Sequence, residues 1–390
     1  MGIDFPGMLH RKHEWARKHK ESEGPVVGCY PGLVPDEILW ACGVLPVQLL
    51  SCPGTYATAR AHLPPYVCDW SKSILEQKLT GAYDYLDGLL VSHVCETVRG
   101  LAGIWRLRWP DQFVHVFTPP VEKDAGAEAY LHAEFRRLAE RLPRPGAKTL
   151  TEEALSEAII LYNVNRALVK RMYEIRGSRP QAVRPEWVLG ALFAGMVMPK
   201  PLHNEMLREF MGSLGADTPS PEAGTSKPRI LLSGLTLEND ALAGDALFSV
   251  LEDADVLVVW DDLASGMRYR LKEVREHGEG GPLDRLVESF MGPQPAPTRG
   301  PMERRAQEIL EAARKYRGQG VIFLVPKYCD PILFDIPDLT RWLGAQGLPS
   351  LVLEVSGTLT KGQDRTRIEA FLEMISDIDA QDPSGVKDSL

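Results

Sequence analysis

The sequence predicts an α/β protein built from two parallel sheets joined by a helical segment. Three observations support this fold class. Short apolar runs alternate with helical patterns between residues 26 and 120, helical patterns alone fill residues 127–212, and the alternation resumes at residue 229. Strands that alternate with helices are typical of parallel sheets, because each parallel connection needs a crossover.

At 390 residues the chain is too long for one ordinary hydrophobic core. We expect an N-terminal α/β domain over residues 1–126, a helical bridging segment and linker over 127–227, and a C-terminal α/β domain over 228–390. Each sheet domain is expected to be of the Rossmann or flavodoxin type. In such sheets ligands gather at the carboxyl ends of the strands, where strand order reverses.

The N-terminal domain opens with a charged helical pattern over residues 8–23, which Gly24 and Pro25 interrupt. A short helix with two acidic residues in its first turn follows Pro35. Further helices are expected over residues 71–87 and from residue 96 onward. The expected strands start at Val26 and cover residues 44–50, 88–92 and 115–120.

The longest helical pattern, LTEEALSEAIILYNVNRALVKRMYEI, has Thr151 as its expected N-cap. Residues 215–228 have the Pro, Gly, Ser and Thr content of a linker, and the tail after Asp377 is polar. The expected C-terminal strands cover residues 229–234, 256–262, 320–325 and 349–355.

Composition excludes several classes of partner. The net charge of −9 provides no field that attracts a phosphate backbone, so no nucleic acid is expected. No apolar stretch approaches the roughly 18 residues of a membrane span, and no apolar run of signal-peptide length follows the basic N-terminus. We therefore expect a cytoplasmic protein with no membrane partner.

Three of the six cysteines lie where a sheet protein binds ligands. Cys95 follows the strand GLLVS, Cys329 follows GVIFLVP, and Cys68 lies on a loop or helix start. Soft thiolate ligands suit iron-sulfur clusters. A lone cysteine is more often a small buried apolar residue, and no C-x-x-C pair supports a metal site. Spacing alone leaves both interpretations open.

The remaining cysteines have simpler interpretations. Cys29 and Cys42 are expected in the core, and Cys52 lies in a turn to which no role is assigned.

Other polar residues have two interpretations each. His93 and Glu96 flank Cys95 and are candidates for moving protons or tuning a cluster, or are ordinary hydrogen-bonding groups. Asp261 and Asp262 end a strand, where they either bind a cation or shift each other's pKa, or cap a helix or brace the loop.

In the last helix, Arg365 and Glu369 are expected to form a surface ion pair, whereas Arg367 lies on another face and is a candidate for binding phosphate. Neither G-x-x-x-x-G-K-[ST] nor G-x-G-x-x-G occurs, so the chain is not expected to hydrolyse ATP itself.

Several ordered segments resemble the benzoyl-CoA reductase and 2-hydroxyacyl-CoA dehydratase family. The resemblance runs from about residue 11 to residue 376. It is carried by VPDEILWACGVLPVQLL, LPPYVCDWSKSILEQKLTGAYDYLDGLLVSHVCETVRGLAGIWR, LLSG with VLVVWDDLASGMRY, and KYCDPILFDIPDL with GQDRTRIEAFLEM.

The resemblance implies that Cys68, Cys95 and Cys329 hold a 4Fe-4S cluster with one iron that no cysteine binds. It implies several partners: a homologous iron-sulfur subunit, a separate ATP-hydrolysing activator module with its own cluster, reduced ferredoxin upstream, and an acyl-CoA substrate. It also implies an anaerobic setting. Arg99, Arg106, Lys327 and Arg367 are candidates for binding the phosphates of CoA.

Two activities follow from the resemblance. The segment GCYPGLVPDEI is similar to a G-x-x-P-x-x-V-P form of benzoyl-CoA reductase small subunits, which favours ATP-dependent reduction of an aryl-CoA ring by single electrons. The alternative is a 2-hydroxyacyl-CoA dehydratase subunit that acts through a ketyl radical. A relay subunit without a substrate pocket and a binding module without metal are the other hypotheses.

Overall fold

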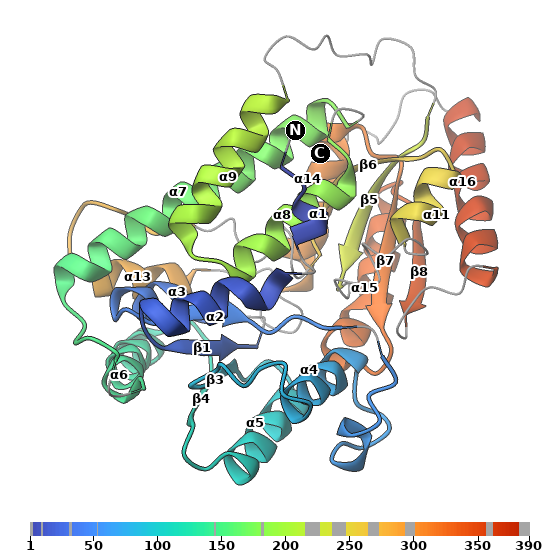
Figure 1. Ribbon diagram of the computed structural model, residues 1–390. Coiled ribbons are helices and arrows are strands. Elements are labelled where there is room, and N and C mark those ends of the chain that lie inside the picture. Colours follow the sequence, from blue (N-terminus) through green and yellow to red (C-terminus); the bar gives the residue numbers. More distant parts are fainter. Residues whose placement is uncertain are drawn as a thin grey trace.

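The computed structural model describes residues 3–381 except 9–10, 31–32, 53, 144–145, 181–182, 215–226, 236–246, 264–272, 293–300 and 356–361. Within these ranges it contains two four-stranded, all-parallel sheets flanked by helices (Figure 1). The expected α/β architecture with a helical middle segment is therefore confirmed.

The N-terminal sheet has the order β2-β1-β3-β4, with all neighbours parallel. Its central strands β1 and β3 are fully buried, because helices cover both faces of the sheet. Its strands are β1 (Val26–Cys29), β2 (Leu45–Gln48), β3 (Gly88–Ser92) and β4 (Phe113–Phe117). Its helices are α1 (Phe5–Met8), α2 (Lys12–Ser22), α3 (Asp36–Ala41), α4 (Asp69–Leu79), α5 (Glu96–Arg108) and the short 3₁₀ turn η2 (Ala59–Ala61).

The C-terminal sheet repeats this arrangement in the order β6-β5-β7-β8. The strand β7 is buried along its whole length. Its strands are β5 (Arg229–Gly234), β6 (Leu257–Asp261), β7 (Gly320–Pro326) and β8 (Ser350–Val355). Its helices are α11 (Leu247–Asp253), α14 (Met302–Tyr316), α15 (Asp330–Ala345) and α16 (Gln363–Gln381).

In its described part the middle segment contains helices and no strand. Its helices are α6 (Ala125–Arg141), α7 (Glu152–Ser178), α8 (Pro185–Val197) and α9 (Lys200–Ser213). The Thr151 hydroxyl caps α7 by accepting from the Ala154 N–H, as the sequence predicts. At 27 residues α7 is about 40 Å long, and it contacts both α3 of the N-terminal half and β6 of the C-terminal half.

Some element boundaries differ from the expectations. The strand expected at 115–120 begins at Phe113 and ends at Phe117, because the two prolines that follow have no N–H for a ladder. The helix expected to reach residue 87 ends at Leu79, where Gly81 adopts a left-handed conformation with φ of +90°. The last helix continues past Asp377 to Gln381, and most of the expected 215–228 linker lies outside the described residues.

A segment from the C-terminal half crosses to the N-terminal sheet. Helix α13 (Pro282–Met291) packs against α6 and α7, and Val274, Leu286 and Val287 join the core that covers β1 and β3. The strand-rich part of each half is thus tied to the other through the helical segment and through this crossing.

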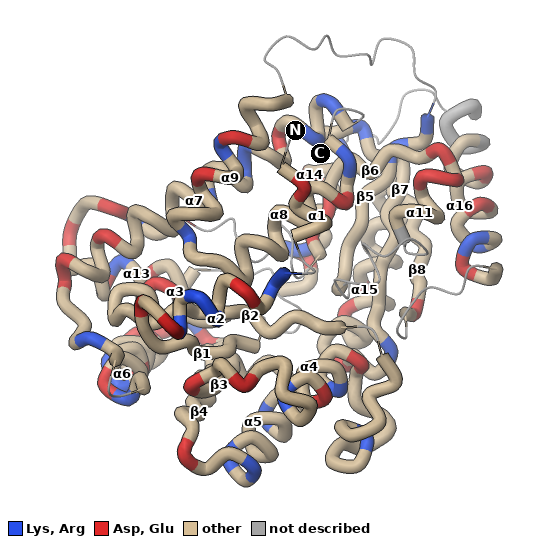
Figure 2. The backbone as a smooth tube through the Cα atoms, in the orientation of Figure 1, with Lys and Arg blue, Asp and Glu red and all other residues tan. Residues whose placement is uncertain are grey.

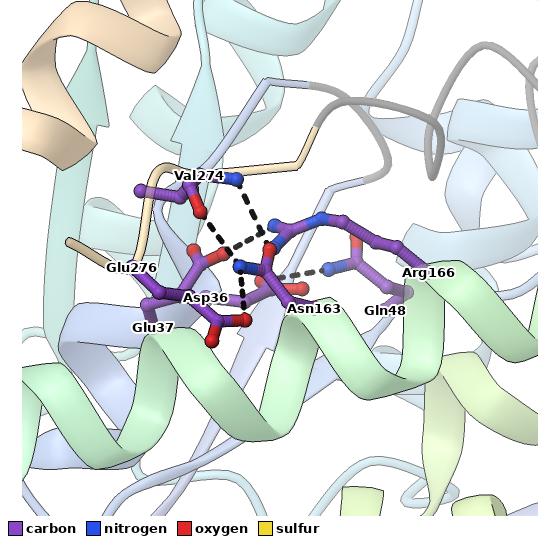
Figure 3. A network of polar contacts seen from close by, with 7 residues as sticks. All are labelled: Asp36, Glu37, Gln48, Asn163, Arg166, Val274 and Glu276. Carbon is purple, nitrogen blue, oxygen red and sulfur yellow. Dashed lines mark hydrogen bonds and ion pairs between the residues drawn. The ribbon is translucent and has the colours of Figure 1, made fainter.

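A polar network fixes the crossing segment to α7 and α3 (Figure 3). The Asn163 side chain makes two hydrogen bonds to the backbone of Val274, donating to its carbonyl at 2.7 Å and accepting from its N–H at 3.0 Å. Beside it, Arg166 forms an ion pair with the buried Glu37. The side-chain amide of Asn163 therefore satisfies both the N–H and the carbonyl of Val274, as the backbone of a neighbouring strand would.

Figure 2 shows acidic and basic residues interspersed along the helices. In the part of the chain that the structure describes, no helix is long and apolar enough to cross a membrane.

Replacing Asn163 with Ala tests whether its side chain holds the crossing segment around Val274 to α7. The variant leaves the Val274 N–H and carbonyl without partners, so we expect a loss of about 2 kcal/mol in the free energy of unfolding, measured in urea. Hydrogen exchange at the Val274 amide is expected to accelerate. Unchanged protection there would contradict the role assigned to Asn163.

Candidate functional site

The two sheets place their strand-order reversals at equivalent positions. The reversal falls between β1 and β3 in one sheet and between β5 and β7 in the other. Cys95 follows β3 and Cys329 follows β7, so both lie beyond a strand that borders a reversal. Tyr30 directly follows β1 at the same edge as Cys95, and its N–H donates to Leu90 of β3 at 3.0 Å.

Each of the three candidate cysteines is the N-cap residue of a helix. Cys68 precedes α4, Cys95 precedes α5 and Cys329 precedes α15. The unpaired N–H groups and the dipole of a helix N-terminus favour an anion such as a thiolate. For Cys95, burial raises the pKa of the thiol, while the N–H groups of Thr97 and Val98 act in the opposite direction.

All three candidate thiols act on one buried tyrosine, Tyr30. Burial is the main cause that raises the pKa of the Tyr30 phenol well above its ordinary value, and all three cysteines add to that shift. Cys68 and Asp330, the residue after Cys329, also act on the pKa of Cys95. Residues from three separate parts of the chain thus influence the same buried groups.

A direct contact joins two of these helix starts. The Lys72 ammonium of α4 lies 5.8 Å from the ring centroid of Tyr328, the residue before Cys329. Tyr328 has a φ of +65°, which is uncommon for a residue with a side chain. This left-handed residue turns the chain from β7 into α15 and so sets the direction of Cys329.

The donor set of the candidate site consists of three thiols. None of the six cysteines forms a disulfide, so the three thiols are not consumed by one. Across the described ranges, no three His, Cys, Asp or Glu side chains lie close enough to hold one metal ion. The ligands of a cluster stand farther apart, because each binds a different iron. Three convergent thiols at helix N-termini have the chemistry that an iron-sulfur cluster needs.

His93 and Glu96 form a pair beside Cys95. His93 Nε2 lies 3.1 Å from Glu96 Oε1, and Arg99 donates to the other oxygen of the same carboxylate at 2.7 Å. The Arg99 guanidinium and then His93 hold the pKa of the exposed Glu96 below its ordinary value. The structure thus places both candidates at the same helix start as Cys95.

Sequence reasoning missed two polar residues of this region, Tyr30 and Ser71. The Tyr30 hydroxyl lies 3.0 Å from the Ser71 hydroxyl, and Ser71 lies 3.5 Å from the Cys68 sulfur. A signal for Ser71 existed, because it stands three residues after Cys68 at the spacing of a capping box. Tyr30 has no motif, and only its place at the end of β1 indicates it.

Asp261 and Asp262 brace the fold. Asp261 is buried and accepts from Arg176 at 2.8 Å and from the Tyr173 hydroxyl at 3.1 Å. Asp262 accepts from Arg305 at 3.3 Å and from the Gly234 N–H at 3.2 Å. Burial raises the pKa of Asp261, Arg176 opposes that shift, and Asp262 adds to it. The bonds of both carboxylates therefore hold neighbouring elements of the fold together.

The other cysteines lie as expected. Cys29 and Cys42 are completely buried in the core of the N-terminal half. Cys52 exchanges backbone hydrogen bonds with the Ser73 hydroxyl, which gives its turn a structural role.

Arg365 and Glu369 form the expected surface ion pair at 2.8 Å.

The four basic candidates for binding CoA have different contacts. Arg367 donates to the Val352 carbonyl at 2.6 Å, and Lys327 lies 5.3 Å from the Tyr328 ring centroid. Arg106 is exposed on α5, and Arg99 is held by Glu96. Lys327 is the one of this set that directly adjoins the Tyr328–Cys329 turn.

Fold and site together define a two-sheet α/β protein with three thiols at the ends of separate helices. The family model described as 2-hydroxyglutaryl-CoA dehydratase, D-component, matches residues 32–375, so the chain belongs to this family, which includes benzoyl-CoA reductase subunits. It is a subunit of an enzyme of the 2-hydroxyacyl-CoA dehydratase or benzoyl-CoA reductase family.

Similar proteins include both kinds of enzyme. The (R)-phenyllactyl-CoA dehydratase beta subunit of Clostridium sporogenes is 26% identical over 95% of this chain and 98% of its own length. A benzoyl-CoA reductase subunit of Thauera aromatica is 30% identical, over 83% of this chain and 84% of its own. The lactoyl-CoA dehydratase subunit beta of Anaerotignum propionicum is 26% identical over 90% and 91%. These relatives are named as subunits, which implies a heteromeric complex.

Replacing Asp261 with Asn tests the buried ion pair. The change keeps the shape of the side chain but leaves the buried Arg176 charge uncompensated, so we expect a loss of about 3 kcal/mol in the free energy of unfolding. Glu369→Gln is the matched control, because its exposed pair with Arg365 contributes at most about 1 kcal/mol. Equal losses in urea denaturation would contradict the assignment.

Proposed function

We propose that this chain is the iron-sulfur subunit of an ATP-dependent aryl-CoA reductase, with Cys68, Cys95 and Cys329 as the ligands of a 4Fe-4S cluster. The convergence of these three N-cap thiols around Tyr30 is the observation that carries the proposal. Three cysteines leave one of four irons without a cysteine of this set. A bound cluster would supply low-potential single electrons to a CoA thioester.

The chain's own residues would serve this group in three ways: by offsetting charge, by excluding water and by moving a proton. The helix N-termini of α4, α5 and α15 offset negative charge on the thiolates. Tyr30, Val67 and Trp70 are buried around Cys68 and limit the access of water. His93 and Glu96 are the proposed groups for moving the proton that accompanies reduction, because their pair adjoins Cys95.

Reduction of an aryl-CoA is favoured by the 30% identity to the benzoyl-CoA reductase subunit of Thauera aromatica and by the segment GCYPGLVPDEI. Dehydration of a 2-hydroxyacyl-CoA is the second candidate. It is favoured by the description of the family model and by the near-complete coverage of the (R)-phenyllactyl-CoA dehydratase beta subunit.

The proposal requires partners. The relatives named as subunits support pairing with a homologous iron-sulfur subunit. The absence of a phosphate-binding loop from the sequence supports a separate ATP-hydrolysing activator with its own cluster, fed by reduced ferredoxin. We propose a cytoplasmic, anaerobic setting, since low-potential clusters react with oxygen.

Single cysteine variants test the ligand set. Cys68→Ser, Cys95→Ser and Cys329→Ser are each expected to lower iron and acid-labile sulfide content severalfold and to abolish turnover, because hydroxyl oxygen is a poor substitute for a soft thiolate ligand. Cys42→Ser is the control, since Cys42 lies in the core and not at a helix N-terminus. Equal loss in all four variants, measured anaerobically, would defeat the assignment.

An electron count separates the two activities. The purified complex is supplied with reduced activator, ATP and either benzoyl-CoA or a 2-hydroxyacyl-CoA. Reduction consumes electrons in proportion to product, whereas dehydration is redox-neutral and returns its electron after each turnover. We expect proportional consumption with benzoyl-CoA. Turnover of the 2-hydroxyacyl-CoA alone, with recycled electrons, would contradict the reductase proposal and support the dehydratase.

A further inference from the structure

A chain of side-chain hydroxyl groups leads from the first sheet to one of the three thiols. The Tyr30 hydroxyl lies 3.0 Å from the Ser71 hydroxyl, which lies 3.5 Å from the Cys68 sulfur. Ser71 is completely buried, and Tyr30 and Cys68 are each only 8% exposed. Water therefore has little access to these three groups, and they must satisfy one another.

The direction of hydrogen bonding in this chain depends on the state of Cys68. A protonated thiol donates to the Ser71 oxygen at 3.5 Å. A metal-bound thiolate has no proton and is an acceptor only. The contact then persists only if the Ser71 hydroxyl donates to the sulfur, which leaves the Ser71 oxygen free to accept from Tyr30 at 3.0 Å.

Cys68 has a side-chain partner at the start of its helix. Neither Cys68 nor Cys95 makes a side-chain capping hydrogen bond to the backbone of its helix. The Cys68 sulfur instead contacts the Ser71 hydroxyl at 3.5 Å. The Tyr30 ring lies 6.4 Å from the Trp70 ring, between centroids, and this packing fixes the phenol independently of its hydroxyl.

We propose that Tyr30 and Ser71 are positioning residues that donate hydrogen bonds in series to the Cys68 sulfur and raise the reduction potential of the cluster. The inference rests on the proposed function, because it requires Cys68 to be a ligand. Reduction adds negative charge to the cluster and its sulfurs, so a donor directed at a sulfur stabilises the reduced state more than the oxidised state. Ser71 acts directly, and Tyr30 acts through Ser71.

The test measures the midpoint potential, not activity. Wild type, Ser71→Ala and Tyr30→Phe are purified anaerobically with the partner subunit. Iron and sulfide are quantified, and the cluster is titrated potentiometrically with electron paramagnetic resonance as the readout. Both variants are expected to retain the cluster and to shift the midpoint to more negative values, Ser71→Ala by more. Ser71→Thr, which keeps a hydroxyl, is expected to restore the wild-type value.

The double variant Tyr30→Phe with Ser71→Ala is expected to match Ser71→Ala alone, because the effect of Tyr30 passes through Ser71. Two matched controls lie in or near the same helix but bond elsewhere. Ser73 donates to the Cys52 carbonyl at 2.9 Å, and Tyr83 donates to the Leu50 carbonyl at 2.8 Å. Ser73→Ala and Tyr83→Phe are expected to leave the potential unchanged.

The outcomes separate this inference from the proposed function. An unchanged potential in Ser71→Ala and Tyr30→Phe, with full iron content, overturns the inference and leaves the cluster assignment standing. Equal shifts in the two controls also overturn it. Wild-type protein without iron and sulfide overturns the proposed function. If Ser71→Ala loses the cluster, the midpoint potential of Tyr30→Phe decides whether the inference stands, because that variant retains Ser71 and the aromatic ring.

Discussion

The convergence of three helix N-termini is the constraint on which the rest of the site depends. Cys68, Cys95 and Cys329 lie far apart in the chain, yet each caps a helix that begins in the same region. A helix N-terminus offers unpaired N–H groups and a partial positive charge, and three of them together favour anionic sulfur more than any one does. At Cys95 the backbone N–H groups of the helix start oppose the effect of burial, which disfavours a negative charge on the sulfur.

Several structural features preserve this convergence. The parallel strands β3 and β7 end shortly before α5 and α15 begin. The long helix α7 contacts elements of both halves. Helix α13 and the segment around Val274 cross back to the N-terminal half. Buried ion pairs such as Arg176 with Asp261 join α7 to β6. Small shifts at any of these contacts would move one helix start relative to the others.

Periodicity predicted most of this fold, because buried parallel strands such as GLLVS and GVIFLVP are short apolar runs between helical patterns. It predicted the ends of elements less well. Pro119 and Gly81 shift two of them for local reasons that a broad pattern does not include. The crossing of α13 was not predicted, since nothing local distinguishes a helix that packs on its own sheet from one that packs on the other.

The site was predictable in part. Strand-end position indicated Cys95 and Cys329, but the shared region of all three thiols depends on tertiary packing, and the family resemblance was needed to select them. Tyr30 contacts Ser71 from a separate element, so spacing alone did not indicate Tyr30. Ser71 stands three residues after Cys68, and that spacing was the one local signal for it.

The most direct test of the account is iron and acid-labile sulfide analysis of the chain, purified anaerobically with its partner. The account predicts about four iron and four sulfide ions on this chain, with a paramagnetic signal after reduction. Protein that is folded and correctly paired but lacks both iron and sulfide on this chain would contradict it.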